Sequence, residues 1–242
     1  MKIFTSIWMV VIVAVVLLGV RVNNNDYVKT LRYKTWDFFQ TIHPRQDVSD
    51  LITIVDIGEE DIKKYGQWPW PRHIMAMLHA RIGDAGAVMI NYNILFAEPD
   101  RMGSKQYLNS FPMSNETREL LQKSLVDTDR VFAEVIKASG NTILMMSVKN
   151  EKDNILPTVT QIIKKGNVVP WLWNYAGIVP PLSVLTVGVA GTGVNVTAPE
   201  PDSIVRKMPI LIAIGEKIYP SMLIENVRAI NKSKRIKVIA KE

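Results

Sequence analysis

Carboxylate side chains follow the first two apolar runs of the chain, Leu51–Ile57 and Val88–Phe96. An open α/β sheet binds its ligand in the crevice beyond the carboxyl ends of its strands, and paired carboxylates there can act as a general acid and a general base. The pattern predicts a ligand cleft lined by some of these acids, which are Asp56, Glu59, Glu60, Glu98 and Asp100. The alternative is a hydrolase that uses Asp56 and Glu98 as its acid–base pair.

Nothing else in the sequence completes a catalytic site. The 242 residues include no cysteine, which excludes a thiolate zinc site, an iron–sulfur cluster and a cysteine nucleophile. His73 and His79 are six residues apart on one predicted helix, so they lie on different faces, and we expect both at the surface rather than on a metal ion. The sequence contains no glycine-flanked serine, phosphate-binding loop or dinucleotide fingerprint. It therefore predicts no catalytic residue, metal or cofactor.

Two tryptophans interleaved with prolines are the most conspicuous local feature. The segment reads Gly66-Gln67-Trp68-Pro69-Trp70-Pro71-Arg72. Proline fixes its own φ angle and restrains the preceding residue, so the two indoles are held in an extended segment that can cover the end of a sheet, while Arg72 projects from a helix start. We favour an aromatic plug over the core, because buried indoles mostly serve packing. A lip that contacts a ligand is the alternative.

These residues are positioned by alternating strands and helices. Leu51–Ile57, Val88–Phe96 and Thr142–Val148 have the composition of buried strands. A helix that begins at Pro71 and ends at Gly86 separates the first two strands, and a helix that ends at Gly140 precedes the third. A polar insertion with a surface helix over Glu116–Leu125 lies between these units. Alternation of this kind predicts an α/β fold with a largely parallel central sheet and helices on both faces.

The last third of the chain changes character. Extended runs are expected at Val159–Ile163, Gly193–Thr197 and Ile204–Ile214, followed by an antiparallel hairpin at Gly215–Lys217. A helix that starts near Pro220 and Ser221 and a basic strand over Arg235–Ala240 complete the prediction. The uncharged stretch from Gly166 to Pro199 contains too many prolines and glycines for a membrane span. We expect loops and strands there.

The amino-terminal segment is apolar enough to meet a membrane. Ile3 to Val20 is a stretch of 18 uncharged residues that would cover about 27 Å as a helix. It predicts one transmembrane helix within residues 1–25, in preference to a cleaved signal peptide. Arg21, Lys29, Arg32 and Lys34 follow the stretch, and the positive-inside rule would keep the domain in the cytoplasm. Long domains translocate largely regardless of such charges, so an external domain stays compatible with the sequence.

A connector helix is expected between this segment and the domain. Its apolar positions recur at steps of three and four residues and end before Pro44, which stops the helix; they are Val28, Leu31, Thr35, Phe38 and Ile42. This seam suits pairing between two copies of the chain, so a homodimer is possible. The net charge of +6 arises from residues of both signs scattered over the chain, which predicts no nucleic-acid partner.

Several segments, in order, resemble the second type of CHASE domain. They are Ile54–Ile57, Gly66–Arg72, Asp84–Ala87, Ile94–Asp100 and Gly193–Asn195, with Pro201-Asp202 and Val205-Arg206. The resemblance covers about residues 26 to 230. It implies a sensory, extracytoplasmic domain of bacterial adenylate or guanylate cyclases, histidine kinases or serine/threonine kinases. In such proteins an amino-terminal membrane helix leads into the domain, and further membrane helices lead to the cytoplasmic output. The chain is therefore expected to be the sensor half of a longer protein or a sensor that has lost its output.

The sequence departs from the family pattern at a few positions. Family members usually carry aspartate at positions 58 and 93, where this chain has Gly58 and Asn93, and glycine where it has Ser203. Hard divalent cations need several oxygen ligands with negative charge among them, so the loss of two acids argues for a neutral or anionic ligand. The positions that agree with the pattern are Asp37, Asp56, Asp129, Asp202 and Arg206.

Together these observations predict a membrane anchor over residues 1–25 and a sensory domain over residues 26–242 without catalysis of its own. The expected ligand-binding residues are Asp56, Trp68, Trp70, Arg72, Asn93, Asp100 and Arg206. A ligand is expected to favour one of two domain arrangements, and the helix Tyr27–Ile42 would pass this bias to the membrane. The expected location is the bacterial inner membrane with the domain in the periplasm. A membrane-anchored scaffold that only binds neighbouring proteins is the alternative.

Overall fold

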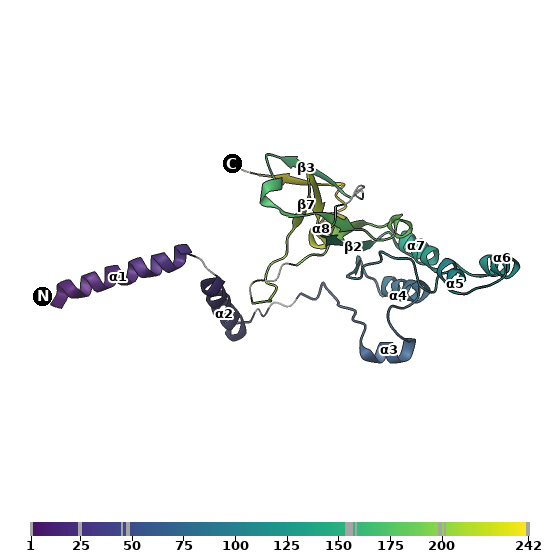
Figure 1. The fold of residues 1–242 in the computed structure, drawn as a ribbon, viewed down its shortest axis with the longest axis horizontal. Helices are drawn as coiled ribbons and strands as arrows, with labels where there is room; N and C mark the ends of the chain where they lie inside the picture. The colour runs from purple at the N-terminus through teal and green to yellow at the C-terminus, as the bar shows by residue number, and fades with distance from the viewer. Residues whose placement is uncertain are drawn as a thin grey trace. The chain divides into compact units, whose positions relative to one another are not determined.

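The computed structural model describes residues 2–23, 26–44, 46, 49–152, 157, 159–197, 200 and 202–240 (Figure 1). The chain divides into two compact units. Unit 1 comprises Met1–Asp56 and Ala198–Arg206, and unit 2 comprises Ile57–Thr197 and Lys207–Glu242. Each unit is described by itself.

Unit 1 contains two helices and the segment that follows them. Helix α1 spans Lys2–Asn23 and helix α2 spans Asp26–Ile42, which confirms the connector helix and its end before Pro44. Within the described part of the chain no single helix is both long and apolar enough to cross a membrane. Only Ile7–Val22 and Asp26–Ile42, taken together as a bent pair, pass that test.

The sheet that carries the main core of unit 2 is built around β2 (Thr142–Lys149). Strands β1 (Ile90–Tyr92) and β6 (Gly191–Val194) pair with β2 in parallel, and β5 (Gly177–Val179) pairs with its last residues antiparallel. Thr142 lies opposite Ile90, and Ile143 lies opposite Gly191.

Helices lie on both faces of this sheet. On one face α4 (Arg72–Asp84) and α7 (Thr128–Ser139) pack on β1 and β2 around Tyr92, Phe96 and Phe132. Successive side chains of a strand point to opposite faces, so Asn91 lies on the other face, where Asn226 of α8 (Met222–Ile230) donates a hydrogen bond to it. The α/β class expected from the sequence is confirmed.

The remaining strands form two further sheets. Strands β4 (Trp173–Tyr175), β7 (Leu211–Ile214) and β8 (Lys217–Pro220) make one sheet, and β3 (Gln161–Lys165) pairs in parallel with β9 (Arg235–Ile239) in the other. Gly215 has a φ of 58° between β7 and β8, so the predicted hairpin is confirmed. Short helices complete the described elements: α3 (Glu59–Tyr65), α5 (Ser104–Ser110), α6 (Asn115–Ser124), η1 (Val169–Trp171) and η2 (Ser183–Thr186).

The predicted first strand is wrong. Leu51–Ile57 forms no strand, and the side chain of Leu51 is 94% exposed. β-branched residues favour a strand only when a neighbouring strand and a packing surface are available, and composition cannot show either. The second and third predicted strands exist as β1 and β2, but β1 covers only Ile90–Tyr92 of the expected Val88–Phe96. The extended run Ile204–Ile214 is a strand only from Leu211 onward.

Candidate functional site

Arg72 lies at the start of α4 and is buried among protein partners. The sequence predicted Pro71 as the first residue of this helix, but the helix begins at Arg72 and Pro71 is the residue before it. The backbone N–H of Arg72 donates to Oδ2 of Asp100 at 2.7 Å, and its Nη2 donates to the carbonyl of Glu98 at 3.1 Å. Its Nε lies 3.3 Å from Oδ1 of Asp129. We call Arg72, Asp100 and Asp129 the Arg72 cluster.

The two carboxylates of this cluster are held differently. Asp100 accepts hydrogen bonds from the hydroxyl of Thr128 at 2.7 Å and from the backbone N–H of Met102 at 3.0 Å. Burial opposes ionisation of Asp100, but the hydrogen bonds that it accepts outweigh burial and lower its pKa. For Asp129 burial dominates and raises the pKa, although it accepts the backbone N–H of Asp100 and faces the Arg72 guanidinium. The cluster resembles an internal ionic network more than an open binding site.

The two tryptophans pack as the favoured interpretation of the sequence expects. Trp70 is 5% exposed and belongs to the core between α4, α7 and β1. Its indole N–H donates to the carbonyl of Gly66 at 2.8 Å, and its ring meets those of Trp68 and Tyr65 edge-on. Trp68 is half-buried against the same core. This geometry favours the aromatic plug over a ligand-contacting lip.

Asparagines meet beyond the carboxyl ends of two parallel strands. Asn93 follows β1, Asn195 follows β6, and the side-chain amide of Asn195 donates to Oδ1 of Asn93 at 2.5 Å. The expectation that parallel strands bring their following residues together holds here. Asn195 was not among the predicted site residues, because the sequence placed it inside the extended run Gly193–Thr197, whereas β6 ends at Val194. Its place in the family-matching segment Gly193–Asn195 was the signal for it. Asp56 ends the first segment of unit 1 and is exposed.

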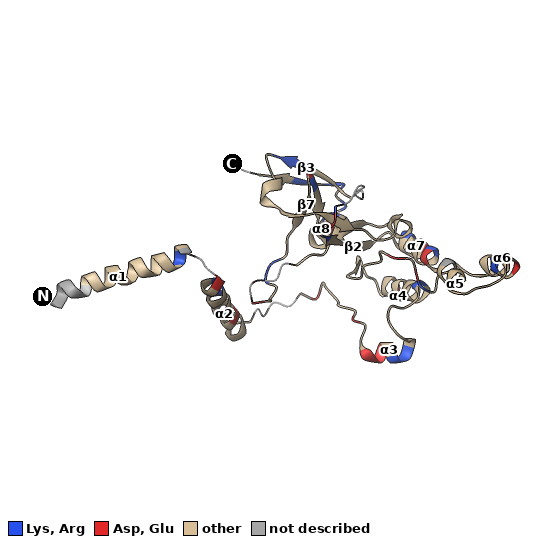
Figure 2. Cartoon of the chain, viewed as in Figure 1, with Lys and Arg blue, Asp and Glu red and all other residues tan. Residues whose placement is uncertain are grey.

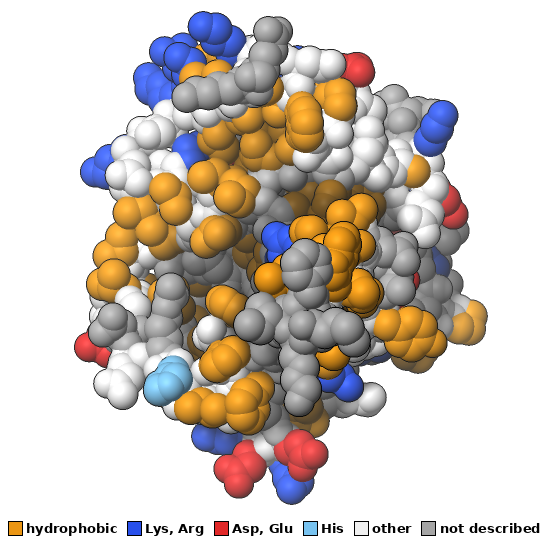
Figure 3. Space-filling view, turned by 90° about the vertical axis from the view of Figure 1, so that its left-hand side faces the viewer, with side chains coloured by type: hydrophobic (Ala, Val, Ile, Leu, Met, Phe, Trp, Pro, Cys, Tyr) orange, Lys and Arg blue, Asp and Glu red, His pale blue; other side chains and the backbone are white. Residues whose placement is uncertain are grey.

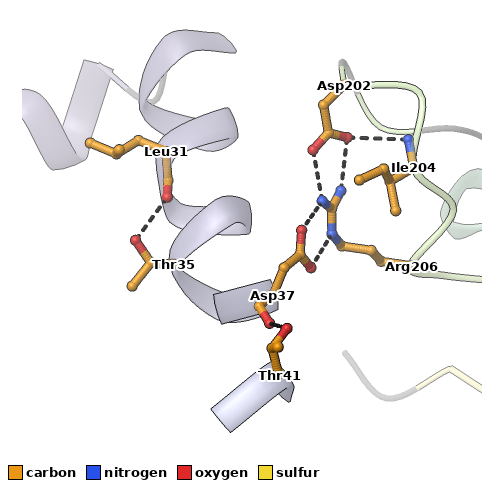
Figure 4. Close-up of polar contacts among 7 residues, drawn as sticks. All are labelled: Leu31, Thr35, Asp37, Thr41, Asp202, Ile204 and Arg206. Carbon is orange, nitrogen blue, oxygen red and sulfur yellow. Dashed lines mark hydrogen bonds and ion pairs between the residues drawn. The ribbon is translucent and has the colours of Figure 1, made fainter. Parts of the chain in front are cut away.

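Arg206 binds two carboxylates of unit 1 at once (Figure 4). Its Nε and Nη2 donate to the two oxygens of Asp37 at 3.0 and 2.5 Å. Its Nη1 and Nη2 donate to the two oxygens of Asp202 at 2.8 and 2.7 Å. The guanidinium also lies 4.8 Å from the ring centre of Tyr33. We call Asp37, Asp202 and Arg206 the Arg206 cluster.

The electrostatics of this cluster keep all three groups charged. The hydrogen bonds from Arg206 lower the pKa of Asp202 to about 2, and those to Asp202 and Asp37 raise the pKa of Arg206. A planar guanidinium that donates a pair of hydrogen bonds to each of two carboxylates fixes the orientation of both carboxylates and their distance from the arginine. Asp37 belongs to α2 and Arg206 to a loop 169 residues further along the chain, so the cluster fastens the connector helix to that loop.

A family comparison decides what kind of chain carries this geometry. The model of the CHASE2 domain matches residues 10–241. The chain belongs to the CHASE2 family. No curated protein and no solved structure matches it. CHASE2 domains are extracytoplasmic sensory domains and not catalytic ones, which agrees with the expectation of a sensor.

Two histidines of this CHASE2 domain behave differently from each other. His73 is exposed, as predicted, but the prediction for His79 is wrong, because its side chain is 1% exposed. Its Nδ1 lies 3.0 Å from the hydroxyl of Tyr92, and its Nε2 lies 2.9 Å from the hydroxyl of Ser139. Hydrogen-bond partners on both nitrogens let the ring sit in the core. Among the residues that the structure describes, no group of three or more His, Asp or Glu side chains could hold a metal ion.

The CHASE2 domain therefore separates the predicted site residues into different surroundings. Arg72 and Asp100 lie together in a buried ionic cluster, and Trp70, which precedes Arg72 closely in sequence, lies in the core. Asn93 lies at a strand end with Asn195, and Arg206 binds the connector helix. Asp37 and Asp129 were noted only as matches to the family pattern, and each proves to be a carboxylate partner of an arginine.

Proposed function

We propose that this CHASE2 domain is the sensory part of a bacterial membrane signalling protein, an adenylate or guanylate cyclase. Residues 1–25 anchor it in the inner membrane, and residues 26–242 form the periplasmic sensor, which converts ligand or stress sensing into control of a cytoplasmic output. The domain itself is not an enzyme. A small-molecule or protein signal and a second copy of the chain are its proposed partners.

The Arg206 cluster is the observation that supports a transmitting role. The loop with Arg206 continues from β6 and leads into β7, so both of its ends are covalently joined to strands of unit 2. The same loop holds α2 through Asp37, and α2 follows the apolar helix α1 in the chain. A change in the loop would therefore act on the helix next to the membrane segment.

Ligand binding is proposed near the carboxyl ends of β1 and β6. Asn93 is exposed there, and the amide groups of Asn93 and Asn195 can donate and accept further hydrogen bonds. The buried Arg72 and Trp70 would then act by holding the surrounding backbone, because the indole N–H of Trp70 and the backbone N–H and Nη2 of Arg72 donate to protein acceptors. A ligand shifts the equilibrium between two arrangements only by its different affinity for each.

A distance measurement tests this function. The chain has no cysteine, so Lys34→Cys and Val205→Cys can carry two spin labels, one on α2 and one on the loop. We expect one narrow distance distribution in the membrane-reconstituted chain and a broad one after Arg206→Gln. Arg206→Lys keeps the positive charge but cannot donate paired hydrogen bonds to both carboxylates, so we expect a distance distribution of intermediate width.

A compound panel then links the contact to sensing. A compound that raises the melting temperature of the chain should also shift the distance distribution. In Arg206→Gln the compound should still raise the melting temperature but leave the distances unchanged. A panel without a stabilising compound, or a bound compound that leaves the wild-type distances unaltered, would contradict the sensory proposal and favour a scaffold.

A further inference from the structure

Strands β3 and β9 place two basic segments side by side. Residues 161–165 contain two lysines and residues 232–239 contain four Lys or Arg residues, six basic residues in all, and neither segment contains an Asp or Glu. The segments are about seventy residues apart in the chain but pair in parallel from Gln161 opposite Arg235 to Lys165 opposite Ile239. The sequence predicted a dispersed positive surplus. Strand pairing instead brings six basic residues together, a number equal to the net positive charge of the whole chain, +6.

The register decides which of these side chains share a face. Paired residues of a parallel ladder point to the same side, and successive residues alternate. One face therefore carries Lys165, Arg235 and Lys237, all exposed, together with Ile163 and Ile239. The opposite face carries the half-buried Ile162, Ile236 and Val238, together with Lys164. We call Ile163, Lys165, Arg235, Lys237 and Ile239 the basic face.

The cations of this face have no carboxylate partner within the described ranges. The one ion pair near it joins Lys164, on the opposite side of the ladder, to Glu216 at 3.7 Å. Lys232 and Lys234 extend the positive charge into the turn before β9, and both are exposed. Figure 2 shows blue Lys and Arg positions on β3 and on the strand beside it, and the upper part of Figure 3 shows Lys and Arg side chains gathered beside exposed hydrophobic ones.

We propose that the basic face docks on anionic phospholipid headgroups. Each basic residue near a negatively charged lipid surface contributes about a fivefold gain in partitioning, and the gains of neighbouring residues multiply. Ile239 is 52% exposed between these cations, so its side chain can enter the headgroup boundary while the cations meet phosphates. This inference rests on the proposed membrane anchor, because α1, whose apolar side chains are exposed, would tether the chain to a bilayer.

The same features disfavour nucleic acid as the occupant. Single-stranded nucleic acid binds on aromatic side chains that stack with its bases, and the basic face carries isoleucine instead. The lipid surface fits both the charge and the interspersed aliphatic groups.

A fluorescent label on the face tests the proposal in the full chain. Ile239→Cys introduces a single cysteine for an environment-sensitive fluorophore, and the labelled chain is reconstituted into vesicles of phosphatidylcholine with or without phosphatidylglycerol. We expect a blue shift with phosphatidylglycerol only, lost at high salt. Neutralising three residues by Lys165→Gln, Arg235→Gln and Lys237→Gln should reduce the docked-to-free ratio about 100-fold. The matched control neutralises three exposed lysines of α3 and α6, by Lys63→Gln, Lys64→Gln and Lys123→Gln, and should keep the shift.

Each other outcome overturns the proposal. An equal shift in both vesicle types would show insertion without electrostatic recognition, and no shift in either would show no docking. An equal shift with polyphosphate or a DNA oligonucleotide in solution would identify a general polyanion site. Loss of the shift in the control variant would assign the effect to net charge. Circular dichroism and melting temperature confirm that each variant is folded.

Discussion

The Arg72 cluster makes a prediction about two carboxylates that look alike in sequence. Asp100 is held ionised by hydrogen bonds from Arg72, Thr128 and Met102, whereas burial raises the pKa of Asp129. Asp100→Asn leaves one acceptor oxygen for the three hydrogen bonds that the carboxylate accepts from the backbone N–H groups of Arg72 and Met102 and the hydroxyl of Thr128, so we expect a loss of about 3 kcal/mol in the free energy of unfolding. Asp129→Asn should cost about 1 kcal/mol. Urea titration measures both values.

A surface acid serves as the control for this pair. Asp84 is exposed at the end of α4, and Asp84→Asn should change stability by less than about 0.5 kcal/mol. Equal losses for Asp100→Asn and Asp129→Asn would show that the two carboxylates are not held differently.

His79 makes a prediction about pH at the same scale. The hydroxyl of Ser139 donates to the carbonyl of Ile136, so it accepts from Nε2 of His79, and Tyr92 then donates to Nδ1. Burial lowers the pKa of this imidazole from its ordinary 6.5. Below pH 6.5 the unfolded chain binds a proton at His79 that the folded chain does not bind. His79 therefore lowers the free energy of unfolding as the pH falls below 6.5, and this loss is absent at higher pH.

The measurement is the melting temperature between pH 8 and pH 5. We expect the wild type to lose stability over this range, and His79→Gln, whose amide cannot be protonated there, to lose less. His73→Gln is the control, because His73 is exposed on the same helix, and it should keep the wild-type slope. An unchanged slope in His79→Gln would exclude His79 as the cause.

At the scale of elements, the packing of α8 on β6 depends on glycine. A Cβ added to Gly193 would lie 2.5 Å from Cα of Met222 and 2.6 Å from its backbone nitrogen, so the helix backbone would have to move. We expect Gly193→Ala to lower the free energy of unfolding by about 2 kcal/mol or more. Gly83, inside α4, has no atom within 4 Å of an added Cβ, so Gly83→Ala should stabilise the chain by about 0.5–1 kcal/mol. Denaturant unfolding of both variants compares them directly, and effects of the same sign would contradict this packing.

At the scale of the whole molecule, α2 has two faces for two partners. At 100° per residue, Tyr33 and Asp37, which contact Arg206, lie on the side opposite Leu31, Phe38 and Ile42. The latter three side chains are exposed, and they form most of the seam that the sequence predicted for pairing of two chains. A second copy could therefore pack on α2 without displacing Arg206.

We expect a dimer of the full chain in detergent, seen by mass measurement in solution. Leu31→Gln with Phe38→Gln should raise its dissociation constant by roughly tenfold or more, since two apolar side chains lose their burial. Trp36→Gln is the control, because Trp36 is exposed away from this seam. A monomeric wild type, or equal weakening by both changes, would contradict pairing through α2.

The proposed location is testable on the whole protein in cells. Met77 of α4 is exposed, whereas Met75 of the same helix is buried. A membrane-impermeant maleimide should label Met77→Cys in intact bacteria, and Met75→Cys should stay unlabelled. Labelling of Met77→Cys only after lysis would place the domain in the cytoplasm.

Local patterns in the sequence were sufficient to predict these helices, the hairpin and the family. The connector helix, the left-handed Gly140 that ends α7, the turn at Gly215 and the helix after Ser221 depend on short-range rules of periodicity and capping, and all are found. The ordered motifs around Gly66–Arg72 and Ile94–Asp100 indicated the family, which the domain comparison confirms.

Tertiary structure alone decided which distant residues meet. Leu51–Ile57 has the composition of a strand but no partner strand. The position of His79 on its helix could not predict that Ser139 lies across the core as a hydrogen-bond partner. Asp37 and Arg206, or Ile163 and Lys237, are far apart in the chain, and they meet only through loop closure and strand pairing over many residues. Local propensity acts within a few residues, whereas ion pairing and burial depend on which surfaces the whole fold brings together.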